Sequence, residues 1–250
     1  MKKYVNLFVF VFMIGACLSQ GRAQTKSAVS YKNPVVDIAM PDPTVIKAAD
    51  GYFYVYATES TRNVPIMKSK DLVEWTYCNT AFTNKTRPRF EPKAGIWAPD
   101  INYINGKYVL YYAMSVWGGE QTCGIGVATA NSPQGPFTDH GKMFRSNEIG
   151  VQNSIDPSLL QYEGRNYLVW GSFRGIYVIE LTADGLSIMS GAKKKRIAGT
   201  AFEAVYIHKH GDYYYMFASI GSCCQGVKST YKVVVGRSKK VWGPYKDKTG

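Results

Sequence analysis

Short apolar segments alternate with polar turns along the chain, and no long amphipathic helix lies between them. One such unit spans residues 40–57: an acidic residue beside a proline precedes two strand-like segments that meet at a turn ending in Gly51. β-branched and aromatic residues bounded by an Asp-Gly turn are typical of a β-hairpin. Three further copies of the unit begin at Asp100, Asp156 and Glu203. The pattern therefore predicts repeated pairs of strands.

Each copy also closes in a similar way, with a turn that opens on Ser or Asn and ends on Trp or on Gly-Pro-aromatic. Such closing segments begin at Ser69, Asn131 and Ser238. A unit of roughly fifty residues, made of strands and turns, suits a four-stranded propeller blade better than a solenoid coil. We therefore predict an all-β propeller with about four blades in this chain, whose innermost strands line a central channel.

The acids that open the copies are Asp42, Asp100, Asp156 and Glu203. We align them at the same point of the repeat and expect them to converge on one end of the channel. A ring of carboxylates is costly unless it holds a cation or forms an acid–base pair whose pKa values are driven apart by repulsion. The second arrangement is that of glycosidases. Because a proline follows Asp42 and Asp156, we expect both residues to be extended.

Composition narrows the class of partner. The chain carries a formal net charge of +12 over 250 residues, and a basic balance is common in proteins that bind nucleic acid. The basic residues are scattered, however, and the one basic run, residues 193–196, falls in an expected surface loop. We predict no nucleic-acid partner. The 19 tyrosines fit half-buried strands and also sugar sites, because each offers a flat apolar face and a hydroxyl group.

Residues 1–23 are predicted to be a signal peptide. Two lysines precede an apolar segment, residues 5–16, that is too short to span a bilayer comfortably. Cleavage after Ala23 would follow a small-x-small pattern, whereas the sequence ending at Cys17 resembles a bacterial lipoprotein signal that would place a lipid on that cysteine. Either route predicts export, to the periplasm, the medium or the envelope surface. The lipid on Cys17 would be the only attachment to a membrane.

The remaining cysteines have no metal-ligand spacing with nearby histidines. They are Cys78, Cys123, Cys223 and Cys224. The adjacent pair is open to two interpretations, a vicinal disulfide or two small side chains in a tight loop.

The chain carries, in order, the motifs MPDPTVI, WAPDINYINGKYVLYYAMS, NSIDPSLL, AFEAVYI and SCCQGVKSTYKVVVGRSKKVWGPY. Together they resemble glycoside hydrolase family 43, whose members are five-bladed β-propeller enzymes that act on arabinan and xylan. The resemblance covers residues 33–250, and the segment with the paired cysteines is most similar to the endo-1,5-α-L-arabinanase branch. It implies an exported, monomeric hydrolase of α-1,5-arabinan, with a fifth blade expected beyond Gly250.

The resemblance also implies a role for each acid. Asp42 matches the general base that activates water, and Glu203 matches the general acid. Asp156 matches the residue that raises the pKa of the proton donor and orients it. The implied mechanism is inversion in a single displacement. Asp100 matches no catalytic acid, and we expect it to be structural or orienting.

Five further residues are expected to contact sugar. Trp97 matches an aromatic residue that packs against arabinose, and Trp117 lies where the family places another aromatic wall; packing between blades is the alternative for both. The others lie beside the catalytic strands and would bond sugar hydroxyls or satisfy buried polar groups: Asn153, Ser154 and Ser172.

The chain departs from the family at three points. Ala204 and Val205 follow Glu203 where a proline is usual, and Arg174 stands where arabinanases often have tryptophan. In the arabinanase branch the fifth blade supplies a histidine to a central metal ion, usually taken to be calcium. The three histidines of this chain do not match it: His140, His208 and His210. We therefore expect the calcium site to be incomplete without residues beyond Gly250.

Three alternatives stay open. An exo-acting α-L-arabinofuranosidase or β-xylosidase of the same family differs only in whether loops block one end of the cleft. A sugar-binding propeller without catalysis is the alternative from another class. A carboxyl separation between Asp42 and Glu203 of about 6.5–9.5 Å would favour an inverting enzyme.

Overall fold

The computed structural model describes residues 30–250, and residues 33–250 form one compact unit. The predicted signal peptide, with Cys17, lies outside the described residues. Within residues 30–250 no helix is long and apolar enough to cross a membrane.

Four antiparallel sheets follow one another along the described part of the chain, and in each the strands pair in sequence order. Blade one contains β1 (Thr44–Lys47), β2 (Phe53–Tyr56), β3 (Pro65–Ser69) and β4 (Thr76–Thr80). Blade two contains β5 (Gly95–Ile104), β6 (Lys107–Ser115), β7 (Gly124–Ala130) and β8 (Thr138–Arg145). Blade three contains β9 (Ser158–Tyr162), β10 (Arg165–Trp170), β11 (Ile176–Glu180) and β12 (Lys195–Ala198). Blade four contains β13 (Glu203–His210), β14 (Tyr213–Ile220) and β15 (Lys232–Ser238).

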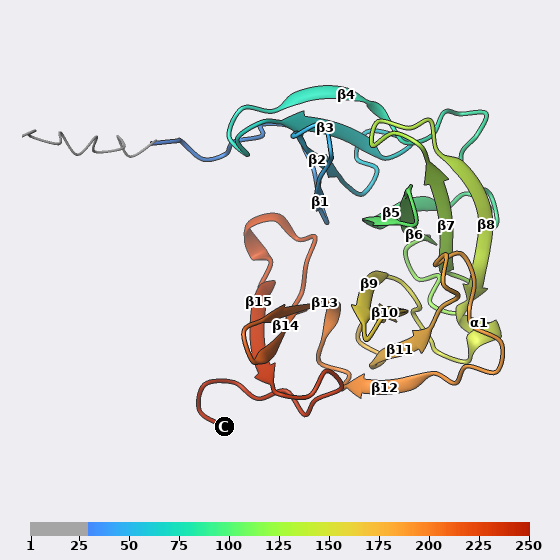
Figure 1. The fold of residues 1–250 in the computed structure, drawn as a ribbon, viewed down its shortest axis with the longest axis vertical. Helices are drawn as coiled ribbons and strands as arrows, with labels where there is room; N and C mark the ends of the chain where they lie inside the picture. The colour runs from blue at the N-terminus through green and yellow to red at the C-terminus, as the bar shows by residue number, and fades with distance from the viewer. Residues whose placement is uncertain (1–29) are drawn as a thin grey trace, which may run out of the picture. The chain divides into compact units, whose positions relative to one another are not determined.

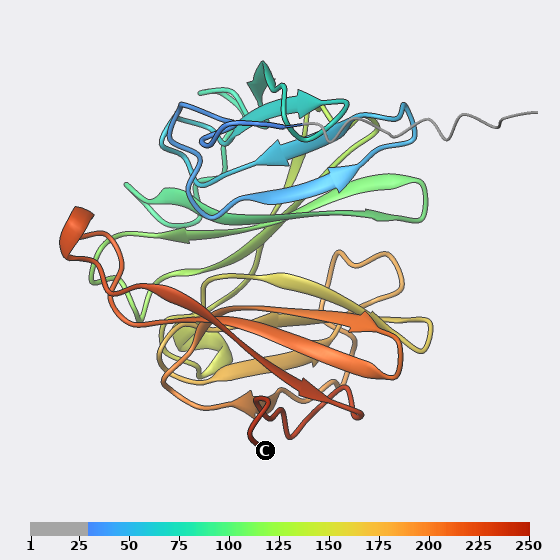
Figure 2. The same cartoon turned by 90° about the vertical axis from the view of Figure 1, so that its left-hand side faces the viewer.

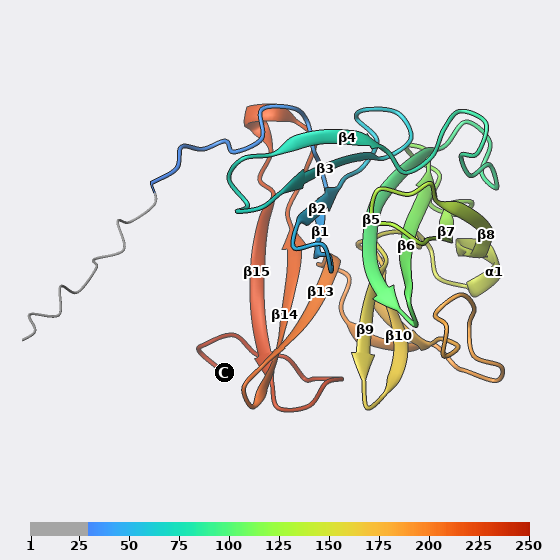
Figure 3. The same cartoon turned by 45° about the horizontal axis from the view of Figure 1, so that its top comes forward.

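The four sheets are arranged as propeller blades (Figure 1). The first strand of each sheet, β1, β5, β9 or β13, lies nearest the centre, and the last strand lies at the periphery. The arrows of β5 and β9 run in the same direction in Figure 3, as expected for equivalent inner strands. The all-β propeller with four blades in this chain is therefore confirmed. Within residues 30–250 two short helices accompany the blades, α1 (Ser146–Ile149) after β8 and η1 (Gly226–Lys228) between β14 and β15.

The hydrophobic core consists of layers between neighbouring blades. Strand residues of blades one and two form one layer, in which the rings of Phe82 and Tyr112 meet edge to face at 5.8 Å. A second layer, around the fully buried Trp170, joins blades two and three. A third joins blades three and four around Val169 and Ile207. The sheets of blades two and three therefore pack against a neighbouring blade on both faces.

The repeat has a different register from the one predicted. Thr44 of β1 pairs with Tyr56, and Asp100 of β5 makes the equivalent pair with Tyr111. The same position is occupied in the other blades by Ser158 and Tyr206. Two residues earlier in every copy the backbone is left-handed, at Asp42 (φ 50°), Ala98 (φ 42°), Asp156 (φ 59°) and Ala204 (φ 51°). The left-handed residue, rather than the acid, is what repeats.

The four acids therefore occupy three different points of the repeat. Asp42 and Asp156 are at the left-handed position, Glu203 is one residue before it, and Asp100 is two residues after it. The expectation that proline would hold Asp42 and Asp156 extended is wrong, because both have positive φ. Aspartate tolerates this conformation better than most residues since its short polar side chain bonds locally.

Candidate active site

Three carboxyl groups from different blades meet at one end of the channel. Asp42 precedes β1, Asp156 precedes β9, and Glu203 is the first residue of β13. The pKa of Asp156 lies well above its ordinary value, because the group is buried and because the charges of Glu203 and then Asp42 oppose its ionisation. A hydrogen bond from the backbone N–H of Ala204 acts in the opposite direction and does not cancel these effects. Asp156 therefore resists ionisation more strongly than an isolated aspartate does.

Glu203 is buried, with 9% of its surface exposed. Its Oε2 accepts a hydrogen bond of 2.6 Å from the hydroxyl of Ser172, a residue that also forms an isolated β-bridge with it. The hydroxyl of Ser172 accepts in turn from Asn153 Nδ2 at 2.9 Å. Asn153 and Ser172 were expected either to bond sugar hydroxyls or to satisfy buried polar groups, and in the structure their side chains are hydrogen-bonded to each other and to the Glu203 carboxyl.

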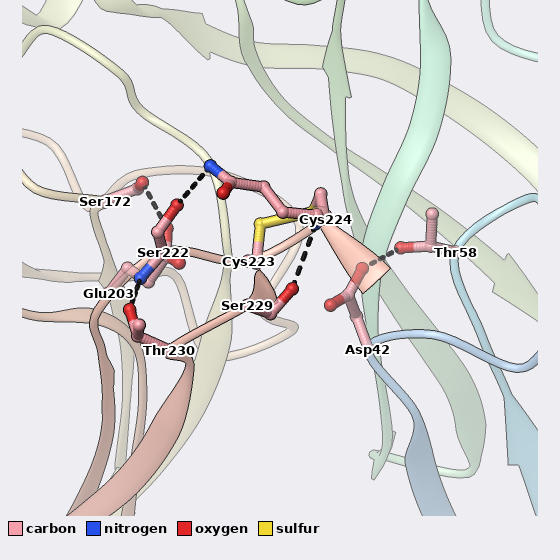
Figure 4. Close-up of a disulfide and its surroundings, with 10 residues drawn as sticks. Asp42, Thr58, Ser172, Glu203, Ser222, Cys223, Cys224, Ser229 and Thr230 are labelled. Carbon is pink, nitrogen blue, oxygen red and sulfur yellow. Dashed lines mark hydrogen bonds between the residues drawn. A yellow bond between two sulfur atoms is a disulfide. The ribbon is translucent and has the colours of Figure 1, made fainter. Parts of the chain in front are cut away.

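Asp42 is exposed and is held by a residue that the sequence did not single out. The hydroxyl of Thr58 donates to Asp42 Oδ2 at 2.5 Å and accepts from the backbone N–H of Ala98 at 2.7 Å. Figure 4 shows the Thr58 and Asp42 side chains turned toward each other. No sequence pattern marks this threonine, since its role depends on the contact between two blades.

Asp100 has the contacts of a structural residue. It is buried, and its Oδ2 accepts from the backbone N–H of Leu159 and from Asn102 Nδ2, both at 2.7 Å. Burial raises the pKa of Asp100 to about 6, although these hydrogen bonds and one with Thr44 lower it. The Asp100 carboxyl therefore bonds to both neighbouring blades, through Leu159 of blade three and Thr44 of blade one. It lies two residues further along its strand than the left-handed position of the repeat.

Two tryptophans form an aromatic surface beside the acids. The rings of Trp97 and Trp117 lie 5.5 Å apart, inclined at 50°. Trp97 is half-buried against Cys123 and Ile155, whereas 77% of the surface of Trp117 is exposed. Because Trp97 immediately precedes the left-handed Ala98, as Glu203 precedes Ala204, the pair lies at the same end of the channel. An exposed aromatic face at this place can stack on the apolar face of a sugar.

Ser154 does not reach the site. It is fully buried, its hydroxyl donates to the carbonyl of Val151 at 2.8 Å, and it accepts from Trp170 Nε1 at 3.1 Å. Of the two roles expected for Ser154, these contacts support the satisfaction of buried polar groups rather than a contact with sugar.

Arg174, the departure from the arabinanase pattern, is an ion-pair partner at the rim. Its guanidinium binds the carboxylate of Glu120 with two hydrogen bonds of 3.0 Å. The carbonyl of Glu120 also accepts from the backbone N–H of Asn153 at 2.7 Å. The pair therefore braces the segment that supports Glu203.

The segment between β14 and β15 carries a disulfide between Cys223 and Cys224. This resolves the two interpretations of the pair, and Cys78 and Cys123 are free. Figure 4 draws the disulfide with Asp42 and Glu203, and Figure 2 shows the segment reaching beyond the strand ends.

The segment is closed by reciprocal bonds. Ser222 N donates to Thr230 Oγ1 at 3.1 Å, and Thr230 N donates to the carbonyl of Ser222 at 3.0 Å. Tyr231 follows directly, and burial together with the charges of Glu203 and Asp156 raises the pKa of its phenol. Sequence reasoning missed Tyr231, whose only signal was its place after the paired cysteines.

The possible calcium site was expected to need residues beyond Gly250. Among residues 30–250 no group of three or more His, Cys, Asp and Glu side chains could hold a metal ion. His140 bonds Thr129 Oγ1 on an outer strand, and His208 and His210 are exposed on β13. The donor set in this part of the chain does not fit the ion, and we derive no step through it.

Comparisons with known proteins match most of the chain. The family model described as glycosyl hydrolases family 43 matches residues 31–250. The extracellular endo-α-(1→5)-L-arabinanase 1 of Bacillus subtilis is 38% identical over 222 residues, which cover 84% of this chain and 68% of that protein. An extracellular exo-α-(1→5)-L-arabinofuranosidase of Cellvibrio japonicus is 37% identical over 237 residues, with 84% and 67% covered. The solved structure of a Cellvibrio cellulosa α-L-arabinanase with arabinohexaose has a TM-score of 0.75 at 33% identity, with 85% and 75% covered.

Proposed function

Because this chain belongs to glycosyl hydrolase family 43, we propose that it cleaves α-1,5-linked arabinan by an inverting single displacement. The chain is a glycosidase of the arabinanase type, acting on O-glycosyl bonds. The proposal extends this to a specific linkage, stereochemistry and set of catalytic residues.

The division of the three acids into a pair and a single residue carries the proposal. Asp156 and Glu203 come from neighbouring blades, and the charge of Glu203 perturbs Asp156 more than the charge of Asp42 does. Two close carboxyls of this kind retain a proton between them at a pH where an isolated carboxyl is ionised. Asp42, exposed and in another blade, is left as the acceptor of a proton.

In the proposed mechanism the carboxylate of Asp42 takes a proton from a water molecule, which attacks the anomeric carbon of arabinose. Glu203 gives its proton to the departing glycosidic oxygen on the opposite face of the ring. Asp156, beside Glu203, sets the charge and orientation of this proton donor. One bond to the anomeric carbon forms as the other breaks, so its configuration is inverted and no glycosyl-enzyme intermediate arises.

We propose internal cleavage, with Trp97 and Trp117 stacking on sugar units beside the scissile bond. The B. subtilis relative is named an endo-acting enzyme and supports this mode, whereas the C. japonicus relative is named an exo-acting enzyme and supports the alternative. An endo enzyme lowers the viscosity of linear arabinan early and releases oligosaccharides of several lengths. An exo enzyme releases one short product throughout and leaves the viscosity high.

The test is to incubate linear arabinan, branched arabinan, arabinoxylan and xylan with the protein and to identify the products. We expect cleavage of linear arabinan with release of the β-anomer, observed by proton NMR before mutarotation. Glu203→Ala should abolish this activity. Full activity in that variant would refute the assignment of the acid, and initial release of the α-anomer would refute inversion.

We also propose that the protein is exported as a monomer, since its signal-like leader accompanies relatives named as extracellular. The mass of the mature protein from cells distinguishes cleavage after Ala23 from a lipid on Cys17. A mature form that retains residues 1–16 would contradict export by either route.

A further inference from the structure

The outer two carboxyls of the site are held in the same way. Thr58 Oγ1 donates to Asp42 Oδ2 at 2.5 Å, and Ser172 Oγ donates to Glu203 Oε2 at 2.6 Å. In each case one oxygen of the carboxyl is engaged by a hydroxyl. The proposed displacement assigns no task to either hydroxyl.

The direction of both hydrogen bonds is determined by a second donor. Thr58 Oγ1 receives the backbone N–H of Ala98, a group that can only donate. Ser172 Oγ receives Asn153 Nδ2, and the same nitrogen donates to the carbonyl oxygen of Ser172 at 3.2 Å. Because that carbonyl can only accept, the amide must present its nitrogen here. Each hydroxyl therefore accepts from its N–H donor and directs its own proton at the carboxyl.

Each of these hydrogen-bond chains, from the N–H donor through the hydroxyl to the carboxyl, also crosses from one blade to the next. Thr58 follows β2 in blade one, and its donor Ala98 belongs to β5 in blade two. Ser172 follows β10 in blade three, and Glu203 begins β13 in blade four. The orientation of both carboxyls is therefore coupled to the packing between blades.

The backbone that carries Thr58 is fixed by the side chain of its neighbour, Glu59. Glu59, the neighbour of Thr58, forms an ion pair with Arg87 through contacts of 2.8 and 2.9 Å, and both side chains are more than nine-tenths buried. Glu59 also accepts from the backbone N–H groups of Asn63 and Ile96, at 2.8 and 3.0 Å. Thr58 thus has little freedom to follow a carboxyl that moves.

From this geometry we propose that Thr58 and the Asn153–Ser172 pair are positioning residues. They engage one oxygen of each catalytic carboxyl, so that Asp42 Oδ1 meets the attacking water and Glu203 Oε1 carries the proton for the leaving oxygen. The proposal rests on the proposed function and assigns Thr58 to the water side of the reaction and Ser172 to the leaving-group side.

Two substrates separate the two sides. Arabinan has an alkoxide leaving group that needs a proton, whereas a 4-nitrophenyl α-1,5-arabinotrioside releases a phenolate that hardly does. Ser172→Ala should lower kcat on arabinan by about 10- to 100-fold, the factor that a hydrogen bond to a charged group supplies. On the nitrophenyl substrate the loss should be about threefold or less. Thr58→Val should lower kcat on both substrates by the same 10- to 100-fold factor.

Conservative and matched variants separate positioning from stability. Thr58→Ser keeps the hydroxyl and should restore kcat to within about threefold of the wild type. Thr129→Val removes a half-buried threonine hydroxyl on β7 and should leave kcat unchanged. Ser69 and Ser172 are equally buried, each with 2% of its surface exposed, but Ser69 lies at the end of blade one that is remote from Thr58. Ser69→Ala should lower the melting temperature and leave kcat unchanged.

The outcomes are distinct. If kcat is unchanged in Thr58→Val and Ser172→Ala, or if only KM rises, the positioning role is overturned. Cleavage of arabinan by the wild type would still uphold the proposed function. An equal loss in Ser69→Ala would show that the effect is one of stability. A wild-type protein that cleaves neither substrate would overturn the proposed function and this proposal with it.

Discussion

Replacing Asp100 with asparagine should stabilise the protein at neutral pH and have no such effect in acid. The carboxyl is buried and accepts hydrogen bonds from Leu159 N and Asn102 Nδ2 on one oxygen. Asparagine keeps an oxygen for these two donors and carries no charge. The variant therefore removes the burial of an anion while preserving the contacts that join blades two and three.

The magnitude follows from the pKa. Burial raises the pKa of Asp100 from 3.8 to about 6, so between these values the native state keeps a proton that the unfolded state has lost. The native state then binds more protons, and the wild type loses stability as the pH rises through this window. Each tenfold change in the acid constant is about 1.4 kcal/mol, which makes the loss roughly 3 kcal/mol above pH ~6. The variant has no such loss.

Urea unfolding followed by tryptophan fluorescence measures this directly. The unfolding free energies of wild type and Asp100→Asn are compared at about pH 3 and about pH 7.5, which lie below and above this window. Other groups titrate in both proteins, Asp156 among them, so their effects cancel in the difference. The difference should shift in favour of the variant by roughly 3 kcal/mol between the two pH values. A difference that stays constant with pH would refute the reasoning.

Two further predictions concern the rim and the support of the site. Trp117→Ala should raise KM for arabinan about tenfold, because a stacking aromatic is worth about 1 kcal/mol or more, and should leave kcat unchanged; Tyr103→Ala, an exposed aromatic at the far turn of blade two, is the control, and an equal change in both would contradict the stacking role. Arg87→Met should lower the unfolding free energy by about 3–5 kcal/mol, because it leaves Glu59 buried without its partner; Glu59→Gln combined with Arg87→Met should recover part of this in urea unfolding, and no recovery would contradict the ion-pair explanation.

The strands and blades could be predicted because the apolar pattern, the Gly turns and the closing segments recur. The register could not be predicted from the acids, because the acidic residue does not stay at one point of the repeat. The prolines were the better guide: Pro43, Pro99 and Pro157 each follow the left-handed residue directly. An alignment of the copies on these prolines makes Ala98, rather than Asp100, the equivalent of Asp42.

The supporting residues could not be predicted for a different reason. Thr58 accepts its backbone donor, Ala98 N–H, from the next blade, and Ser172 contacts Glu203 across the boundary between blades three and four. A pattern within one repeat carries no information on such contacts. Ser154 shows the same limit in reverse. It stands one residue from Asn153 and two from Asp156, yet its hydroxyl points into the core and bonds Trp170. Proximity in sequence to a catalytic strand was therefore a poor guide to the site.

The offset of the acids within the repeat accounts for their unequal chemistry. If all four carboxyls occupied one point of the repeat, each would face the channel in the same way and resist ionisation about equally. Instead Asp100 is two residues further along, where it is buried and bonded by Leu159 and Asn102. Glu203 is one residue before the left-handed position, which is held by Ala204, and the backbone N–H of Ala204 donates to the Asp156 carboxyl. Shifts of one or two residues along otherwise equivalent strands thus give one buried structural acid, one close pair of carboxyls and one exposed carboxyl.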